Sequence, residues 1–522
     1  MLPDARSIWR ETKMIRNTFT GRLPLLASTA LLIVLTGCSV RPEPLTLDQQ
    51  IAQAGADRQA MFASQEALSA PVTLEQAIAR ALKYNLQHRV TLMEQALEDR
   101  VLDASAADML PKLATRAGLR TRSNVLASVS ESVATGQVSL VPSTSSEKTS
   151  STVDLQLGWN VLDFGLSYYG AQAQANKLLA AEERRRRVVL NIVEQVRAAW
   201  WEAVTAERLK PQVTAILAEA RQALEQARQT EQQRLLPPLE SLRYQKALVE
   251  IVQQLEALEA DMAIARTQLA SLMNLPPATP VQIALPGDAT PSLAKLGYTL
   301  EDLEAIAMVE RPEVREEAYI ARNVALETRM NLLKLLPGVT LFAGLNRDDN
   351  SYLVNNNWAD AGVQVSWNLL SVLNWSKVEA TGEARGKVAE VRRQALRMAV
   401  LTQVNLAWRR HERAERLYDR YNSLQEIESR IQSQIDAAAA SDAQTQLERI
   451  RAGASALLAT RARDRAYAEL QNAYGAIHQA AGFDPVPPQT PSGSIDQIAV
   501  AIKTQMDAVS QGNAIKAPAL TN

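Results

Sequence analysis

The feature that most constrains this chain is a strand-to-helix junction that occurs twice. In both places apolar residues alternate with polar or small ones, and a long polar stretch rich in helix-forming residues follows. The alternating apolar residues are Val153, Leu155, Leu157 and Trp159 in the first copy, and Ala361, Val363, Val365 and Trp367 in the second. A period of two predicts a strand with one apolar and one wet face, whereas the spacing from Tyr169 onward predicts a helix.

The segments around these junctions are duplicated at constant offsets. Thr73-Leu74-Glu75-Gln76 corresponds to Thr299-Leu300-Glu301-Asp302, an offset of 299 − 73 = 226. After the strands, Trp159-Asn160 corresponds to Trp367-Asn368, an offset of 367 − 159 = 208. The missing 226 − 208 = 18 residues are expected in the hairpin loop, because insertions are tolerated at exposed tips. The first copy is therefore expected to carry the longer loop, in the Ser/Thr/Val-rich segment 123–151.

Proline positions and capping signals divide each copy into helix, β-hairpin, long helix and long helix. The predicted fold class is mainly α with a β portion, in two tandem repeats. Helices are expected over 47–66, from Thr73, and over 86–108, 169–234, 239–273, 376–437, 447–481 and 495–509. The expected divisions are a signal peptide (1–37), a lipid-anchored segment (38–72), repeat 1 (73–276), a linker (277–298), repeat 2 (299–485) and a C-terminal tail (486–522). Loose order is expected only for the part of this tail that follows the helix over 495–509.

The N-terminal segment has the pattern of a bacterial secretory signal. Arg16 and Arg22 precede a short apolar run, too short for a standard membrane span, and Leu35-Thr36-Gly37-Cys38 resembles a lipobox. Cys38 is therefore predicted to be lipid-modified and to become the first mature residue, although an incidental cysteine is the alternative. The Ser at position 39 favours sorting to the outer membrane. Either Met1 or Met14 could be the true start.

Charge and composition argue against a nucleic-acid-binding protein or an enzyme. The formal net charge is −1, and the run Arg184 to Arg187 is interpreted as a solvated helix face. His88, His411 and His478 are the three histidines, and none has a metal-ligand partner at useful spacing. The stretch 382–387 resembles a phosphate-binding loop only superficially, because it lacks the length and strand context. No cofactor or metal is predicted.

The number of strands bears on how the chain could act at a membrane. Its strands approach the roughly 9–11 tilted residues that cross a bilayer, but one chain supplies only four of them. An open sheet edge in hydrocarbon leaves backbone groups unpaired, so several chains would have to close one barrel. Two chains would give eight strands and a filled interior, whereas three would give twelve strands and a lumen.

The chain resembles the TolC family of outer-membrane efflux proteins, including its lipoprotein members, over residues 73–485. The motifs that carry this resemblance are the lipobox, TLEQAIARALKYN at the first repeat, LPKL and LPGV before the strands, and WNVLDFG at the junction. The resemblance implies a homotrimer that forms a twelve-stranded outer-membrane β-barrel, continued by a periplasmic α-helical barrel. It also implies a passive exit duct that works with a periplasmic adaptor and an inner-membrane pump of the RND or ABC class.

Site residues follow from the same resemblance, position by position. The adaptor-docking tips fall at Arg234, Leu235, Leu236 and Pro237 in the first copy, and at Ser441 and Asp442 in the second. Neither tip has the glycine that is usual in the family, which puts ordinary docking in doubt. The periplasmic gate candidates are Glu448, its offset partner Glu240, and Arg451, which occupies the family's second acidic position. A helix-surface Glu448 paired with Arg451 or Arg449 is the alternative.

Trp159 and Trp367 are predicted to lie at the membrane interface, with plain packing as the alternative. The rival function is a structural periplasm-spanning coiled-coil lipoprotein without channel activity. It explains the long helices and the anchor, but it does not explain two amphipathic hairpins. The cargo cannot be determined from the sequence, and candidates include drugs, metals, peptides, proteins and polysaccharides.

Overall fold

The computed structural model describes residues 42–68, 71–233, 237–286, 296–439, 446–486 and 493–519. The chain divides into two compact units, Met1–Ala63 and Ser64–Asn522. In the first unit, α2 (Leu47–Phe62) starts with a capping box: the Thr46 hydroxyl accepts from the Gln49 amide, and the Gln49 side chain accepts from the Thr46 amide. None of the residues of α2 is buried, and the helix ends four residues before the expected Glu66.

The second unit contains the two repeats, and their elements correspond at the offsets expected from the sequence. Repeat 1 consists of α3 (Leu74–Tyr84), α4 (Leu86–Ala107), β1 (Lys112–Thr121), β2 (Thr149–Asn160), α5 (Val161–Gln232) and α6 (Pro238–Leu272). Repeat 2 consists of α7 (Leu300–Glu310), α8 (Pro312–Leu333), β3 (Gly338–Asp348), β4 (Asn357–Ser366), a 3₁₀ turn η1 (Leu369–Asn374), α9 (Trp375–Ala439) and α10 (Gln446–Ala481). The starts of β1 and β3 differ by 338 − 112 = 226, and those of α6 and α10 by 446 − 238 = 208.

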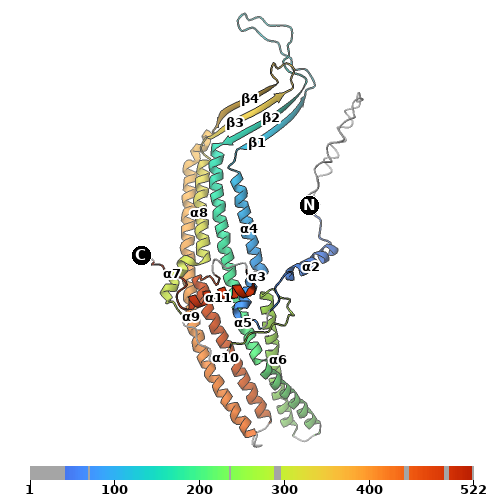
Figure 1. Ribbon diagram of the computed structural model, residues 1–522, viewed down its shortest axis with the longest axis vertical. Helices are drawn as coiled ribbons and strands as arrows, with labels where there is room; N and C mark the ends of the chain where they lie inside the picture. Colours follow the sequence, from blue (N-terminus) through green and yellow to red (C-terminus); the bar gives the residue numbers. More distant parts are fainter. Residues whose placement is uncertain are drawn as a thin grey trace. The chain divides into compact units, whose positions relative to one another are not determined.

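The four strands form one antiparallel sheet in the order β1-β2-β3-β4. Figure 1 shows the sheet at one end of this unit, and at the other end the last turns of α5 and α9 with the first turns of α6 and α10. At 1.5 Å per residue, the 72-residue α5 is roughly 110 Å long, and it remains helical through Pro211. None of the described helices combines the length and apolar character needed to cross a membrane.

Local sequence explains where several of the helices begin. Thr73 and Thr299 both form capping boxes, as the sequence predicts, and α6 and α8 start with proline at a position where the missing N–H carries no cost. The pair α5–α6 is held by a heptad-like seam, because apolar side chains of α6 recur at alternating spacings of three and four. The buried members of that seam on α6 are Leu248, Ile251, Leu255, Leu258, Met262, Ala265 and Leu269.

Two features of α5 differ from the sequence-based expectation. The helix begins at Val161, eight residues before the expected Tyr169, because the strand ends directly in a capping residue. The arginine run 184–187 is not a solvated face. Arg186 pairs with Asp484 at 3.0 Å, and the side chains of Arg184 and Arg187 reach Glu316 on α8 at 3.1 and 3.3 Å.

The C-terminal segment contains the expected helix, which packs against the rest of the unit. Helix α11 (Ile495–Ser510) buries Ile495, Ile498 and Ile502 in a core cluster with residues of α3 and of the middle of α5. Beyond it, the Tyr298 hydroxyl donates to the carbonyl of Ile515 and accepts from its amide, both at 3.0 Å. The predicted helix over 495–509 is therefore confirmed, and the described residues beyond it contact the rest of the unit.

Candidate functional site

The sheet carries an exposed apolar face, and strand register makes this face continuous. In the pairing, Leu157 lies opposite Leu113 on β1 and Ala343 on β3, whereas Leu155 lies opposite Thr115 and Leu345. The large apolar side chains on this face are exposed by 40 to 76%. They are Leu113, Leu119, Val153, Leu155, Leu157, Leu341, Leu345, Val363 and Val365. A face of this kind marks a surface that meets a partner or a lipid phase.

The opposite face of the same sheet is mostly polar, since successive side chains alternate between faces. Its polar members are Lys112, Arg116, Arg120, Ser150, Thr152, Asp154, Gln156, Asn160, Thr340, Asn346, Asp348, Asp360, Gln364 and Ser366. Phe342 and Trp358 are aromatic exceptions. Gly362 leaves room for the Phe342 ring, because a Cβ atom there would lie 2.7 Å from the ring. Across β3 and β4, the Asn346 amide donates to Asp360 at 2.8 Å.

Both outer strands of the sheet have an open edge. Within the described part of the chain, β1 pairs only with β2, and β4 pairs only with β3. β1 carries three cationic residues on the polar face, whereas β4 carries the carboxylate of Asp360 there. The two edges therefore offer unpaired backbone groups and side chains of opposite charge.

The two strand-to-helix junctions share a sequence motif but differ in geometry. The Asn160 side chain accepts from the amides of Leu162 and Asp163 at 2.9 and 3.0 Å, and so caps α5. Its amide nitrogen donates to the Thr340 hydroxyl at 2.9 Å. The equivalent Asn368 makes no side-chain cap, and η1 follows it instead of an α-helix.

The two tryptophans of these junctions both make contacts within the chain. Trp159 is half-buried and packs edge-on against Phe164, with ring centroids 5.6 Å apart. Trp367 is 50% exposed, and its indole N–H donates to the Leu335 carbonyl at 3.0 Å. The exposed ring and satisfied N–H of Trp367 suit an interfacial position, whereas the indole N–H of Trp159 is buried without a hydrogen-bond partner. A membrane-interface role for both residues stays a prediction.

At the opposite end of the unit, the structure describes only part of the predicted tips. Pro237 is the N-cap residue of α6 and Glu240 lies in its first turn, exposed. The other predicted tip residues lie outside the described residues: Arg234, Leu235, Leu236, Ser441 and Asp442. The predicted lipidation site, Cys38, also lies outside them. Their roles in lipidation and docking stay predictions.

The gate candidates of the second copy lie on the first turn of α10. Glu448 accepts from Arg451 at 3.0 Å, and both side chains are almost half exposed. Arg449 instead pairs with Glu219 on α5. The ion pair that the alternative interpretation predicted is present, and exposed pairs of this type contribute only about 0–1 kcal/mol. Such a weak pair leaves the carboxylate able to exchange partners, so the gate role remains a prediction.

A buried charge cluster joins the two repeats where α5 passes α8, and sequence reasoning missed it. Glu183 is 3% exposed and pairs with Arg186 and with Arg315 of α8. Burial raises the pKa of Glu183, whereas the two arginines oppose that rise. The pKa of Arg186 is raised because Asp484 and Glu183 outweigh the effect of its burial. This cluster fixes the long helix of one repeat to the other repeat.

Comparison with known proteins was informative at the level of structure. No protein-family model and no curated protein sequence matches the chain. Solved structures with the same fold include the outer-membrane channels OprN, CmeC and MtrE, and six such structures have sequence identities of 11 to 17%. The resemblance to TolC-family channels is therefore confirmed for the fold.

Three of these structures illustrate the extent of the match. The channel CmeC of Campylobacter jejuni superposes with a TM-score of 0.62 at 11% identity, covering 91% of this chain and 98% of that one. CusC, described as forming a transmembrane channel, gives 0.60 at 14% identity over 81% and 96% of the two chains. The open state of MtrE from Neisseria gonorrhoeae gives 0.57 at 15% identity over 78% and 88%.

Proposed function

We propose that this chain is the outer-membrane channel of a tripartite efflux or type I secretion system. In this role it is a passive exit duct, and the energy for transport comes from an inner-membrane pump. The observation that carries the proposal is the sheet with one apolar face, one polar face and two open edges. The fold shared with outer-membrane channels supports it.

The exposed apolar face argues for contact with lipid. At about 25 cal/mol per Å², leaving a continuous row of leucine and valine side chains in water is unfavourable, and a hydrocarbon phase removes that cost. The strands are 10 to 12 residues long, close to the roughly 9–11 that a tilted strand needs to cross the hydrocarbon layer. The polar face would then line an aqueous lumen.

The open edges argue for several copies in one barrel. Unpaired backbone groups are costly in hydrocarbon, so β1 of one copy must pair with β4 of the next. Three copies give 3 × 4 = 12 strands and leave a lumen, whereas two give eight and a filled interior. The cations of β1 and the carboxylate of Asp360 on β4 favour this pairing. We therefore propose a homotrimer, with the helical hairpins forming a tube that extends into the periplasm.

The remaining partners follow from this arrangement. The tips of the helical hairpins would contact a periplasmic adaptor, which connects the duct to an RND or ABC pump. Three copies of Glu448 would form a ring of carboxylates near the tips, and such a ring favours cations. Lipid modification at Cys38 would add an anchor to the outer membrane.

Conductance tests the proposal directly. The purified full-length protein is added to planar bilayers and examined in parallel as unheated and heated samples by gel electrophoresis. We expect stepwise currents and a heat-modifiable oligomer. A lone monomer that passes no current would contradict the proposal and favour the periplasm-spanning lipoprotein without channel activity. That alternative leaves the amphipathic sheet unexplained.

A further inference from the structure

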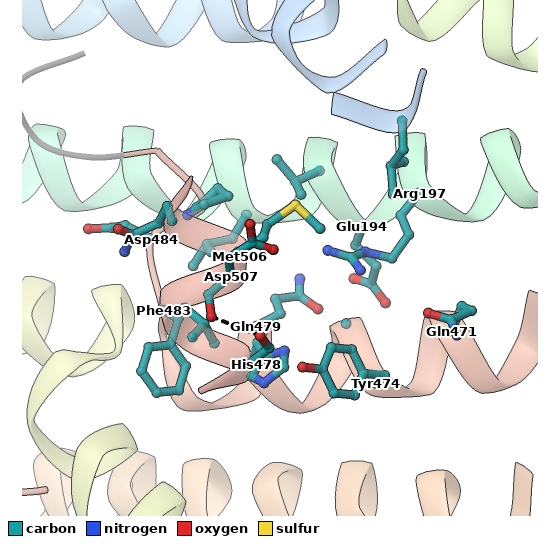
Figure 2. Close-up of a pocket in the computed structure, with 18 residues that line it drawn as sticks. Glu194, Arg197, Gln471, Tyr474, His478, Gln479, Phe483, Asp484, Met506 and Asp507 are labelled. Carbon is teal, nitrogen blue, oxygen red and sulfur yellow. Dashed lines mark hydrogen bonds between the residues drawn. The ribbon is translucent and has the colours of Figure 1, made fainter. Parts of the chain in front are cut away.

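A cavity of about 270 Å³ lies where α5, α10 and α11 meet, away from the sheet and from the helical tips. Figure 2 shows its two sides: Arg197 and Glu194 project from α5, and Tyr474 and His478 project from α10. Part of the wall is apolar, formed by Leu74, Leu190, Val193, Met506 and Val509. The volume is near the lower end of the roughly 300–1,000 Å³ typical of small-molecule sites.

Arg197 provides a cation that no described carboxylate contacts directly, although the charges of Glu75 and Glu194 act on it from farther away. Among the described residues, it forms no ion pair and no hydrogen bond. Its side chain lies across Gly475, where a Cβ atom would be 2.7 Å from the Arg197 Nε. The missing side chain at Gly475 is thus what admits the guanidinium. Burial lowers the pKa of Arg197, and the charges of Tyr474, Glu75 and Glu194 oppose that effect only in part.

Two polar groups on α10 face the cavity without partners. Tyr474 is 8% exposed, and its hydroxyl has no hydrogen-bond partner. The His478 Nε2 atom is likewise buried and unpartnered. Burial, with the neighbouring charge of Arg197, lowers the pKa of His478 to about 3, so the ring is neutral at physiological pH. Buried polar groups without partners are uncommon, and here they accompany an unpaired cation.

The acidic residues of the lining complete the charge pattern. Asp484 is already paired with Arg186 at 3.0 Å. Glu194 and Asp507 are exposed at the rim, and the described residues offer neither side chain an ion pair. The cavity therefore combines hydrogen-bond donors inside, free carboxylates at the rim and an apolar wall.

We propose that this cavity binds a small zwitterion with an apolar body, of the chemistry of an apolar α-amino acid. The carboxylate accepts from Arg197 and from the Tyr474 hydroxyl, since a guanidinium and a hydroxyl are strong donors for that group. The ammonium group faces Glu194 and Asp507. The apolar body covers the aliphatic wall. This site is separate from the proposed duct, and its test does not depend on conductance.

Isothermal titration calorimetry on the purified full chain in detergent tests the proposal with four probes. They are phenylalanine, N-acetyl-phenylalanine without the ammonium, phenylalanine amide without the carboxylate, and inorganic phosphate. We expect phenylalanine to bind best, and removal of either charge to weaken binding about tenfold or more. Equal or tighter binding of phosphate or N-acetyl-phenylalanine would overturn the zwitterion assignment. If phenylalanine at about 10 mM shows no binding, its affinity is weaker than that of any specific site, and this result would also overturn the assignment.

Matched variants locate the site. Arg197→Gln is expected to weaken phenylalanine binding about tenfold or more. Arg410→Gln removes the same charge from an exposed position outside the cavity and should bind as the wild type does. Gly475→Ala keeps every charge but displaces the guanidinium, so it should also weaken phenylalanine binding. This variant provides the test if Arg197→Gln does not fold. Wild-type affinity in both cavity variants would refute the site.

Discussion

Two adjacent positions on β2 allow the orientation of the sheet to be tested with a matched pair of variants. Leu155 lies on the apolar face and is 40% exposed, whereas Gln156 lies on the polar face. Both are near the middle of the strand, so Leu155→Arg and Gln156→Arg introduce the same charge at the same depth. Only the face differs, because side chains alternate across a strand.

The expected magnitudes follow from this geometry. An arginine that faces lipid at the bilayer midplane costs about 2–4 kcal/mol, a factor of roughly 30 to 1,000 for each protomer. In a homotrimer the cost is incurred three times, about 6–12 kcal/mol in total. Gln156→Arg places the charge in water beside Ala114 and Gly344, where surface substitutions usually change stability by about 0.5 kcal/mol or less.

The assay is the fraction of each variant recovered from outer membranes as a heat-modifiable oligomer. We expect Leu155→Arg to lose most of this fraction and Gln156→Arg to retain it. Equal recovery of the two variants would refute the assignment of the apolar face to lipid. A greater loss for Gln156→Arg would reverse it and place the polar face outward.

Three further predictions concern the junction, the cavity histidine and the gate. Asn160→Ala should speed hydrogen exchange in the first turn of α5 about fivefold, equivalent to the ~1 kcal/mol of a lost cap, while Asn368→Ala, which removes no cap, should leave η1 unchanged. The folded-state pKa of His478, about 3, lies below its ordinary value, so its contribution to stability is full above roughly pH 6.5 and declines as the pH falls toward 3. Melting curves between pH 7 and 4 should therefore show a weaker pH dependence for His478→Gln than for the wild type, and identical slopes would contradict this. Glu448→Gln should change single-channel conductance or ion preference in planar bilayers, and no change in either would remove Glu448 from the gate.

The duplicated pattern made much of the fold predictable from the sequence. The offsets of 226 and 208 fixed which elements correspond, because both copies must present the same apolar face at the same point in the chain. Capping signals at Thr73 and Thr299 predicted two helix starts correctly, because a capping box depends only on residues three positions apart. Features determined by local spacing were therefore recovered well.

Features determined by contacts between distant segments were missed. The run 184–187 has no local signal that distinguishes a solvated face from a buried one, because its partners Glu316 and Asp484 come from the other repeat. The cavity likewise depends on Arg197 meeting Gly475, a residue 278 positions away (475 − 197). The spacing of the histidines predicted that His478 is an isolated residue on a helix face. In the structure it is buried and lines the cavity together with Arg197.

The two junctions show why a repeated motif does not guarantee a repeated structure. β2 has a neighbour on each side, and Thr340 on β3 accepts a hydrogen bond from the Asn160 amide nitrogen. This contact orients the Asn160 oxygen toward the free amides of α5, and the cap forms. Among the described residues β4 is an edge strand, and none of them forms a further strand beside Asn368 that could orient its side chain. The motif thus sets where strand gives way to helix, while the neighbouring strand determines how the helix begins.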